Sequence, residues 1–255
     1  MVFLHKRIDN LQQKDVEIIL SALENSPELD YSAQTFICNV ANVFPNDTIS
    51  FLLNRISRKH ISLEYDIFSY TDIPYGMTIK LEKNALDVFL TGITSWICNN
   101  INQPMMKYDA RKLLKTICID ERTLLREATK AKDRYVEDKS ITSRIIVEIF
   151  LSMLSIRYIA NNYDIIEPIL HSLMTDGDIS KKEILDIFVV SYVPSSKSRT
   201  PGNPSEYDLQ LMGVSEKALL VMPYDSILRQ LFERVKKYAE QEIANDKKMD
   251  EEWGL

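Results

Sequence analysis

Glycine is scarce in this sequence, with only 6 among 255 residues. A protein built of many tight turns needs glycine where the backbone takes positive φ angles, so this scarcity argues against an all-β fold. Long apolar runs are also missing, since the strongest one, from Ile145 to Leu151, is interrupted by Glu148. A membrane-spanning helix needs about 20 predominantly apolar residues. The sequence therefore predicts no such helix.

Cysteine and histidine are few and widely spaced. The chain has three cysteines, Cys38, Cys98 and Cys118, and three histidines, His5, His60 and His171. No two cysteines have the C-x-x-C spacing of zinc or redox sites, and no two histidines have the H-E-x-x-H spacing of a metalloprotease. We therefore expect buried, reduced thiols, no metal site and no cofactor.

Two common catalytic motifs are missing as well. The sequence contains neither the G-x-x-x-x-G-K-[ST] loop that cradles phosphate nor the G-x-S-x-G elbow of a nucleophilic serine. The sequence therefore predicts that the protein is not an enzyme of either class.

The amino-terminal residues do not have the pattern of a secretory signal. The first seven residues place their charges after a very short apolar stretch, which is the reverse of such a signal. This order predicts a cytoplasmic protein.

Positive charge is not in excess. A formal net charge of −6 argues against a surface that is wholly a nucleic-acid footprint, because such surfaces are strongly basic. Locally, 11 basic residues face 7 carboxylates between Lys107 and Arg144. This stretch could follow a nucleic-acid backbone, but on amphipathic helices such a balance is more typical of a solvated face. We do not favour nucleic acid as the partner.

Apolar residues recur at helical spacing along most of the chain. One early helix face carries them at i, i+3, i+4 and i+7, namely Val16, Ile19, Leu20 and Leu23. Pro45 is placed to open a later helix, residues 141–160 form a long apolar helix, and residues 180–183 have the form of a capping box. The pattern predicts an all-α fold of stacked antiparallel helix pairs, arranged as a HEAT-like α-solenoid.

Two segments interrupt the helical pattern. Residues 61–77 spread aromatic and acidic residues around a proline, and residues 191–208 contain three prolines among small polar residues. We expect an ordered connection at the first and a mobile loop at the second. The predicted domains are a HEAT-like helical array over 1–190, the proline-rich loop over 191–208, and C-terminal helices over 209–255 that pack on the array and end in a charged, frayed tail.

One part of the array has a distinctive order of residues. Pro45 opens a helix that runs to Arg55, and Ile73-Pro74-Tyr75 follow in the connection. This order resembles HEAT-like helical regions in the C-terminal parts of large bacterial signalling and phage-defence proteins, including those attached to NACHT-like ATPase modules. The similarity covers about Val43 to Asn99. It implies a non-catalytic scaffold or sensor that binds another protein, in a bacterial defence or signalling system.

Residues suited to binding a protein partner lie in the two interruptions, where regular stacking stops. They are aromatic or cationic, and comprise Tyr65, Phe68, Tyr70, Tyr75, Lys197 and Arg199. Aromatic residues and arginine carry much of the binding energy at protein interfaces. We therefore expect the docking surface for a protein partner to include these positions.

Arg55 and His60 offer an alternative function. Their separation by four residues is similar to the R-x4-6-H element of HEPN-type ribonucleases, and that resemblance implies an all-helical nuclease, usually dimeric, in which both side chains assist attack by a ribose hydroxyl. Ile56, however, stands where that family generally has a polar residue. Basic residues also gather at helix C-termini because they complement the helix dipole, and we favour that interpretation.

Residues 176–183 are similar to the end of an EF-hand calcium loop through Gly177 and Glu183. With Glu183 as the last ligand, Ser172 and Met174 stand where the first two acidic ligands belong. Calcium needs those oxygens. A helix end, a glycine turn and a capping box explain the same residues.

Overall fold

The computed structural model describes residues 11–26, 29–62, 78–175, 179–194 and 197–253. These residues form helices joined by turns, and none of them lies in a β-strand. The prediction of an all-α fold with stacked helix pairs is therefore confirmed, whereas the solenoid arrangement stays a prediction. The chain divides into two compact units, residues 1–119 and 120–255. The predicted boundaries at the proline-rich loop stay a prediction.

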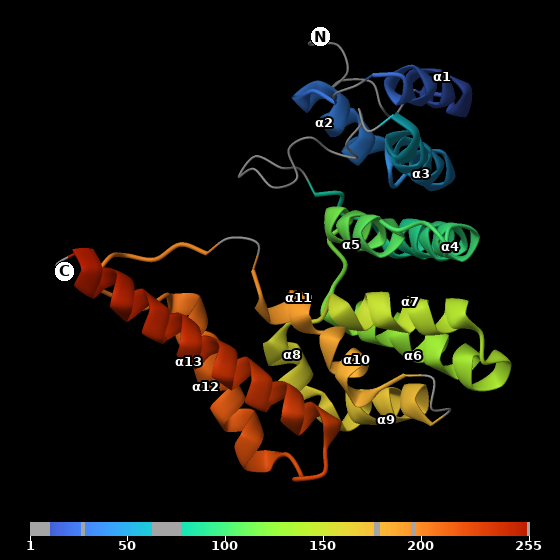
Figure 1. Cartoon of the computed structure of the whole chain (residues 1–255). Helices are drawn as coiled ribbons and strands as arrows, with labels where there is room; N and C mark the ends of the chain where they lie inside the picture. Colours follow the sequence, from blue (N-terminus) through green and yellow to red (C-terminus); the bar gives the residue numbers. More distant parts are fainter. Residues whose placement is uncertain (1–10, 27–28, 63–77, 176–178, 195–196, 254–255) are drawn as a thin grey trace. The chain divides into compact units, whose positions relative to one another are not determined.

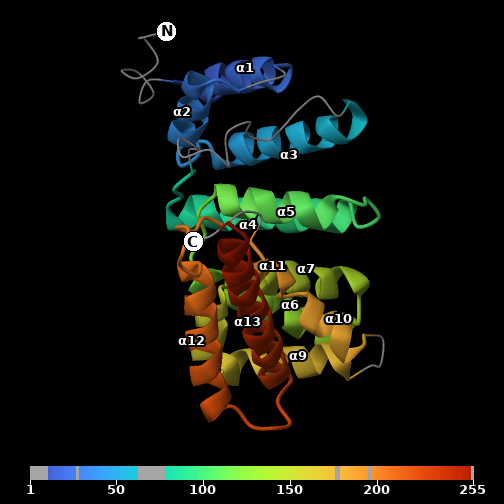
Figure 2. The same cartoon turned by 60° about the vertical axis from the view of Figure 1, so that its left-hand side comes forward.

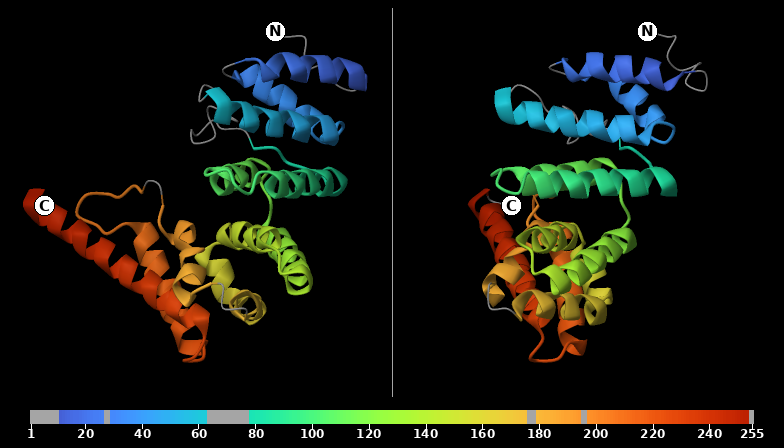
Figure 3. Two further views of the ribbon diagram at one scale, coloured as in Figure 1. Left: turned by 45° about the vertical axis from the view of Figure 1, so that its right-hand side comes forward. Right: turned by 90° about the vertical axis from the view of Figure 1, so that its right-hand side faces the viewer.

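The first unit holds α1 (Gln13–Glu24), α2 (Tyr31–Val40), α3 (Pro45–Ser62), α4 (Lys83–Asn99) and α5 (Met106–Thr116). Within it, α3 packs against α1, α2 and α4, and α4 packs against α5. Figures 1 and 3 show α1, α3 and the α4–α5 pair as successive layers of this unit. Their buried apolar residues include Val16, Phe51 and Phe89. Burial of such faces stabilises helices that would be marginal alone in water.

Local sequence signals position the helices of this unit. Pro45 opens α3, as predicted, and Asp30 caps α2 by accepting a hydrogen bond from the Ala33 amide at 2.8 Å. Where α3 meets α4, a methyl group added to Gly92 would lie 2.9 Å from a side-chain carbon of Ile49. The absence of a side chain at Gly92 therefore sets how closely these two helices approach.

The second unit begins with α6 (Glu121–Asp138), α7 (Ile141–Ser152), α8 (Ile156–Asn161) and α9 (Tyr163–Met174). It continues with α10 (Lys181–Asp186), α11 (Val189–Tyr192), α12 (Glu206–Val221) and α13 (Ile227–Trp253). The pairs α6–α7 and α12–α13 make its most extensive helix contacts, and Figure 2 shows α12 and α13 side by side. Because α13 also packs against α9 and α10, and α12 against α8, the α12–α13 hairpin belongs to the same packed unit.

The single long helix predicted over residues 141–160 is divided in two. Residues 153–155 separate α7 from α8. Ser155 caps α8 by accepting from the Tyr158 amide, while its own amide donates to the carboxylate of Glu121 at 2.6 Å. The break therefore involves a contact from α6 that apolar periodicity does not reveal.

The last two helices are longer than predicted. α12 begins at Glu206, inside the range expected for the proline-rich loop. α13 continues to Trp253, through the stretch that was expected to fray. Both extensions carry ion pairs with the segment that precedes α12, and these form the first part of the candidate site. In contrast, the capping box predicted at Ser180 and Glu183 is confirmed.

The cysteines differ partly from the prediction. All three are free, but Cys98 and Cys118 are exposed, so the prediction of buried thiols is wrong for these two. Cys118 follows α5 with a φ angle of 46°, which turns the chain out of the helix. Cys38 is half-buried, and its burial raises the pKa of the thiol to about 11.

Candidate functional site

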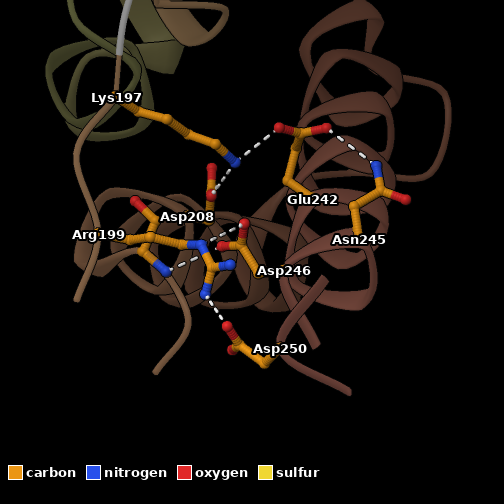
Figure 4. A network of polar contacts seen from close by, with 8 residues as sticks. Lys197, Arg199, Asp208, Glu242, Asn245, Asp246 and Asp250 are labelled. Carbon is orange, nitrogen blue, oxygen red and sulfur yellow. Dashed lines mark hydrogen bonds and ion pairs between the residues drawn. The ribbon is translucent and has the colours of Figure 1, made fainter. Parts of the chain in front are cut away.

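The segment from Lys197 to Ser205, which we call the strap, leads into α12 and carries the two cations singled out from the sequence (Figure 4). Lys197 Nζ lies 2.8 Å from Asp208 Oδ2 on α12 and 2.6 Å from Glu242 Oε2 on α13. Asp208 has no exposed surface, and a buried charge is costly unless another group of the protein pairs with it. Lys197 is that partner, and it also links the two helices.

Arg199 fastens the strap to the end of α13. Its Nε lies 3.2 Å from Asp246 Oδ1, and its Nη1 lies 2.7 Å from Asp250 Oδ1. Together with Glu242, these carboxylates stand at i, i+4 and i+8 on one face of α13. Like charges at this spacing destabilise an isolated helix, and Lys197 and Arg199 offset that repulsion. The helix therefore continues where the sequence predicts fraying.

Ser205 and Asp208 have the spacing of a capping box at the start of α12. That box is not formed, because Ser205 makes no side-chain cap hydrogen bond. Its amide donates instead to Asp246 Oδ2 at 3.2 Å, and the Asp208 carboxylate pairs with Lys197. Contacts from distant parts of the chain thus replace the local motif.

The network contains two cations and four carboxylates, so its net charge is negative. Burial by itself would lower the pKa of Lys197, but hydrogen bonds with Asp208 and Glu242, together with the negative charges of Asp208 and Asp246, outweigh burial and raise that pKa. The hydrogen bond from Lys197 holds the pKa of Glu242 below its usual value. Lys197 and Glu242 are therefore both charged at neutral pH, and their ion pair joins the strap to α13. Among the described residues, no group of three or more His, Cys, Asp or Glu side chains is arranged to hold a metal ion.

The opposite end of the α12–α13 hairpin is the hairpin turn, residues 222–226. Glu167 on α9 accepts hydrogen bonds there from Ser226 Oγ at 2.9 Å, and from the amides of Ile227 and Leu228 at 2.6 and 3.1 Å. A carboxylate is favoured at a helix N-terminus, where the amides give a partial positive charge. Glu167 therefore fixes the start of α13.

Arg229, which lies on α13, stabilises the conformation of the hairpin turn. Its amide donates to Ser226 Oγ, and its Nη1 donates to the carbonyl oxygens of Leu219 and Met222 at 2.8 and 3.0 Å. The same guanidinium lies 4.2 Å from the centre of the Tyr224 ring, which is a cation–π contact. The turn therefore has a defined conformation although much of it is exposed.

Large apolar side chains are exposed around this turn. Leu220 is 86%, Val221 63% and Tyr224 89% exposed, and we call these three residues the turn surface. Residues of α9 and of the hairpin turn also form a hollow of about 320 Å³. Its lining includes Pro223 and Asp225, the chain neighbours of Tyr224. Covering exposed apolar groups of this kind is favourable because it removes them from water.

Of the six binding residues predicted from the sequence, the structure describes two. The aromatic residues Tyr65, Phe68, Tyr70 and Tyr75 lie outside the described residues. Lys197 and Arg199 are described, and Figure 4 shows their charged groups directed at carboxylates of the same chain. The cationic ends of these two side chains thus hold the strap in place.

Arg55 is buried in the first unit, with 1% of its surface exposed. Its Nη1 donates to the carbonyl oxygens of Leu23 and Ser26 at 2.8 and 2.7 Å. Leu23 lies in the last turn of α1, and Ser26 follows two residues after the helix ends. Arg55 therefore helps to join α1 to α3. The side chain of His60 lies outside the described part of the chain.

Sequence reasoning missed Glu167, Arg229 and the turn surface. A serine directly before the apolar pair at residues 227–228 was a signal for a helix start. No local pattern marks its partner, because 59 residues separate Ser226 from Glu167. The acidic residues at 242, 246 and 250, which share one face of α13, were a sequence signal for the partners of Lys197 and Arg199.

None of the described helices combines the length and the apolar content needed to cross a membrane. Comparison of the chain with protein-family models, with curated proteins and with solved structures finds no match. The resemblance of Val43 to Asn99 to HEAT-like regions therefore stays a prediction.

Proposed function

We propose that this chain is a non-catalytic helical scaffold or sensor that binds another protein, and that the partner docks on the turn surface. The observation that supports the proposal is the exposure of Leu220, Val221 and Tyr224 beside a turn that several hydrogen bonds hold in one conformation. The resemblance of residues 43–99 would place such a scaffold in a bacterial defence or signalling system.

A fixed, exposed aromatic side chain is a favourable anchor for a partner. Burying apolar surface contributes roughly 25 cal/mol per Å², and tyrosine loses little conformational freedom because it has few rotatable bonds. The ring of Tyr224 contacts the guanidinium of Arg229, and this contact reduces the conformational freedom that the ring loses on binding. Leu220 and Val221, four and three residues earlier in the chain, are further exposed apolar side chains.

The test is quantitative affinity purification of the tagged full chain from cells of its source organism. The turn variant combines Leu220→Ser and Tyr224→Ser. A matched control combines Val136→Ser and Val190→Ser, which replaces two exposed apolar residues of the same unit. We expect the turn variant to recover at least about tenfold less of a stoichiometric partner, and the control to recover as much as the wild type.

Circular dichroism of the wild type, the turn variant and the control tests whether the three proteins have the same helix content. Equal recovery of the partner by the wild type and the turn variant would show that docking takes place elsewhere. Failure of the wild type to recover any stoichiometric protein would refute the scaffold itself.

A further inference from the structure

We infer that the docking segment of the partner carries a lysine or arginine beside an apolar residue, with the basic side chain entering the hollow next to Tyr224. This inference rests on the proposed function and specifies the chemistry of the partner. The basic group follows from the charges of the hollow, and the apolar group follows from the turn surface.

The charged groups that line the hollow are acidic. They are Asp164, Glu167 and Asp225, and among the described residues no lysine or arginine shares the lining. Glu167 is engaged with the start of α13. Asp164 and Asp225 are exposed, and no described cation forms an ion pair with either of them. These two carboxylates are therefore available to a cation from outside the chain.

The same arrangement disfavours an anionic ligand. A helix N-terminus commonly binds phosphate or carboxylate through its first amides. Here the amides of Ile227 and Leu228 already donate to Glu167, so an anion would meet carboxylates in place of free donors. His171 also lines the hollow, and its Nε2 lies 3.4 Å from Glu167 Oε1. It adds positive charge only when protonated.

The apolar and acidic features are adjacent in the chain. Tyr224 lies between Pro223 and Asp225, both of which line the hollow. Tyr163 and Pro168 on α9 add apolar wall, against which the methylene groups of a lysine or arginine can pack. A basic residue in the hollow thus brings its apolar neighbour to the turn surface.

The experiment selects binders from a phage library of random 12-residue peptides on the immobilised full chain. Enriched peptides are then synthesised with a fluorescein label, and their Kd is measured by fluorescence anisotropy. The hollow variant combines Asp164→Asn and Asp225→Asn, and the turn variant is the one described above. A charge-matched control combines Glu137→Gln and Glu251→Gln, two exposed carboxylates of the same unit.

We expect enriched peptides to place lysine or arginine next to an aliphatic or aromatic residue. Their Kd should rise at least about tenfold with the hollow variant and with the turn variant, and less than about twofold with the control. Peptides that lose affinity only with the turn variant, or that lack basic residues, would overturn this inference and leave the proposed function standing.

Two other outcomes also contradict the inference. Peptides that bind both variants as tightly as the wild type would locate binding elsewhere and remove the support for the docking surface as well. Sedimentation that shows self-association of the wild type, lost in the turn variant, would identify a second copy of the chain as the occupant.

Discussion

At the scale of single residues, the second unit contains a buried carboxylate whose charge is paired. Asp208 is fully buried, and Lys197 is the cation that contacts it. Removal of one partner from such a pair is costly, because the remaining charge stays out of water without compensation. Since Lys197 also contacts Glu242, its loss would loosen the strap from both helices of the hairpin.

We predict that Lys197→Met lowers the unfolding free energy of the second unit by about 2–3 kcal/mol. The measurement is urea unfolding of the full chain, followed by circular dichroism. Lys248→Met is the control, because Lys248 is 77% exposed and lies 3.9 Å from Glu252. We expect less than about 0.5 kcal/mol for that change. Equal effects of the two substitutions would show that the Lys197 pair does not stabilise the fold.

The depressed pKa of Glu242 predicts a specific acid dependence. Its hydrogen bond from Lys197 lowers the folded pKa below the unfolded value of 4.5. The stability that results is therefore fully present above pH 4.5 and is lost as the pH falls through the folded pKa. The raised pKa of Lys197 has the opposite sign, and its contribution is lost only in strongly alkaline solution.

We therefore expect the stability difference between the wild type and Lys197→Met to be constant from about pH 5 to 7 and to shrink below about pH 4.5. The measurement is the urea midpoint of both proteins across that range. Carboxylates that cap helices, such as Glu183, also have lowered pKa values, but they contribute equally to both proteins. A difference that does not change with pH would contradict the pairing of Lys197 with Glu242.

At the scale of helices, two glycines show how packing determines whether a glycine-to-alanine substitution stabilises the protein. Gly92 on α4 meets Ile49 on α3 so closely that a Cβ atom would lie at 2.9 Å. Gly213 on α12 has nothing within 4 Å of the position where a Cβ atom would stand. Alanine favours the helix at both positions by up to about 1 kcal/mol, but only Gly213 has the space for it.

We predict that Gly213→Ala raises the unfolding free energy by about 0.5–1 kcal/mol. Gly92→Ala should lower it by about 1 kcal/mol, because overpacking against a stiff, β-branched side chain exceeds the gain in helix propensity. Thermal and urea unfolding of the two variants measure both effects. Stabilisation by Gly92→Ala would mean that α3 and α4 can move apart at little cost.

At the scale of the whole molecule, each compact unit contains its own buried helices. In the second unit, the α6–α7 and α12–α13 pairs, the strap network and the Glu167 cap all lie within residues 120–255. A unit of this size can bury enough apolar surface to fold alone.

We predict that residues 120–255, produced separately, give a helical circular dichroism spectrum and one cooperative urea transition. Lys197→Met should lower the midpoint of that transition, as it does in the full chain. A fragment without cooperative unfolding would show that the second unit depends on residues 1–119.

The sequence by itself determined the fold class and many of the helix signals. Apolar residues at 3.6-residue spacing predict the helices, Pro45 marks the start of α3, and the capping box of Ser180 and Glu183 marks the start of α10. Such features could be predicted because each depends on residues within a few positions of one another, where the geometry of a helix brings them together.

Only the tertiary structure decided where the long helix breaks, why α13 continues to residue 253, and which groups form the candidate site. The Ser155 amide meets Glu121 across 34 residues of chain, and Lys197 meets Glu242 across 45. These contacts depend on how helices pack within the unit, and no local pattern reports that packing. The exposure of the turn surface also depends on packing. The helix period predicts an apolar stripe on each helix, but it does not predict which apolar side chains other helices leave exposed.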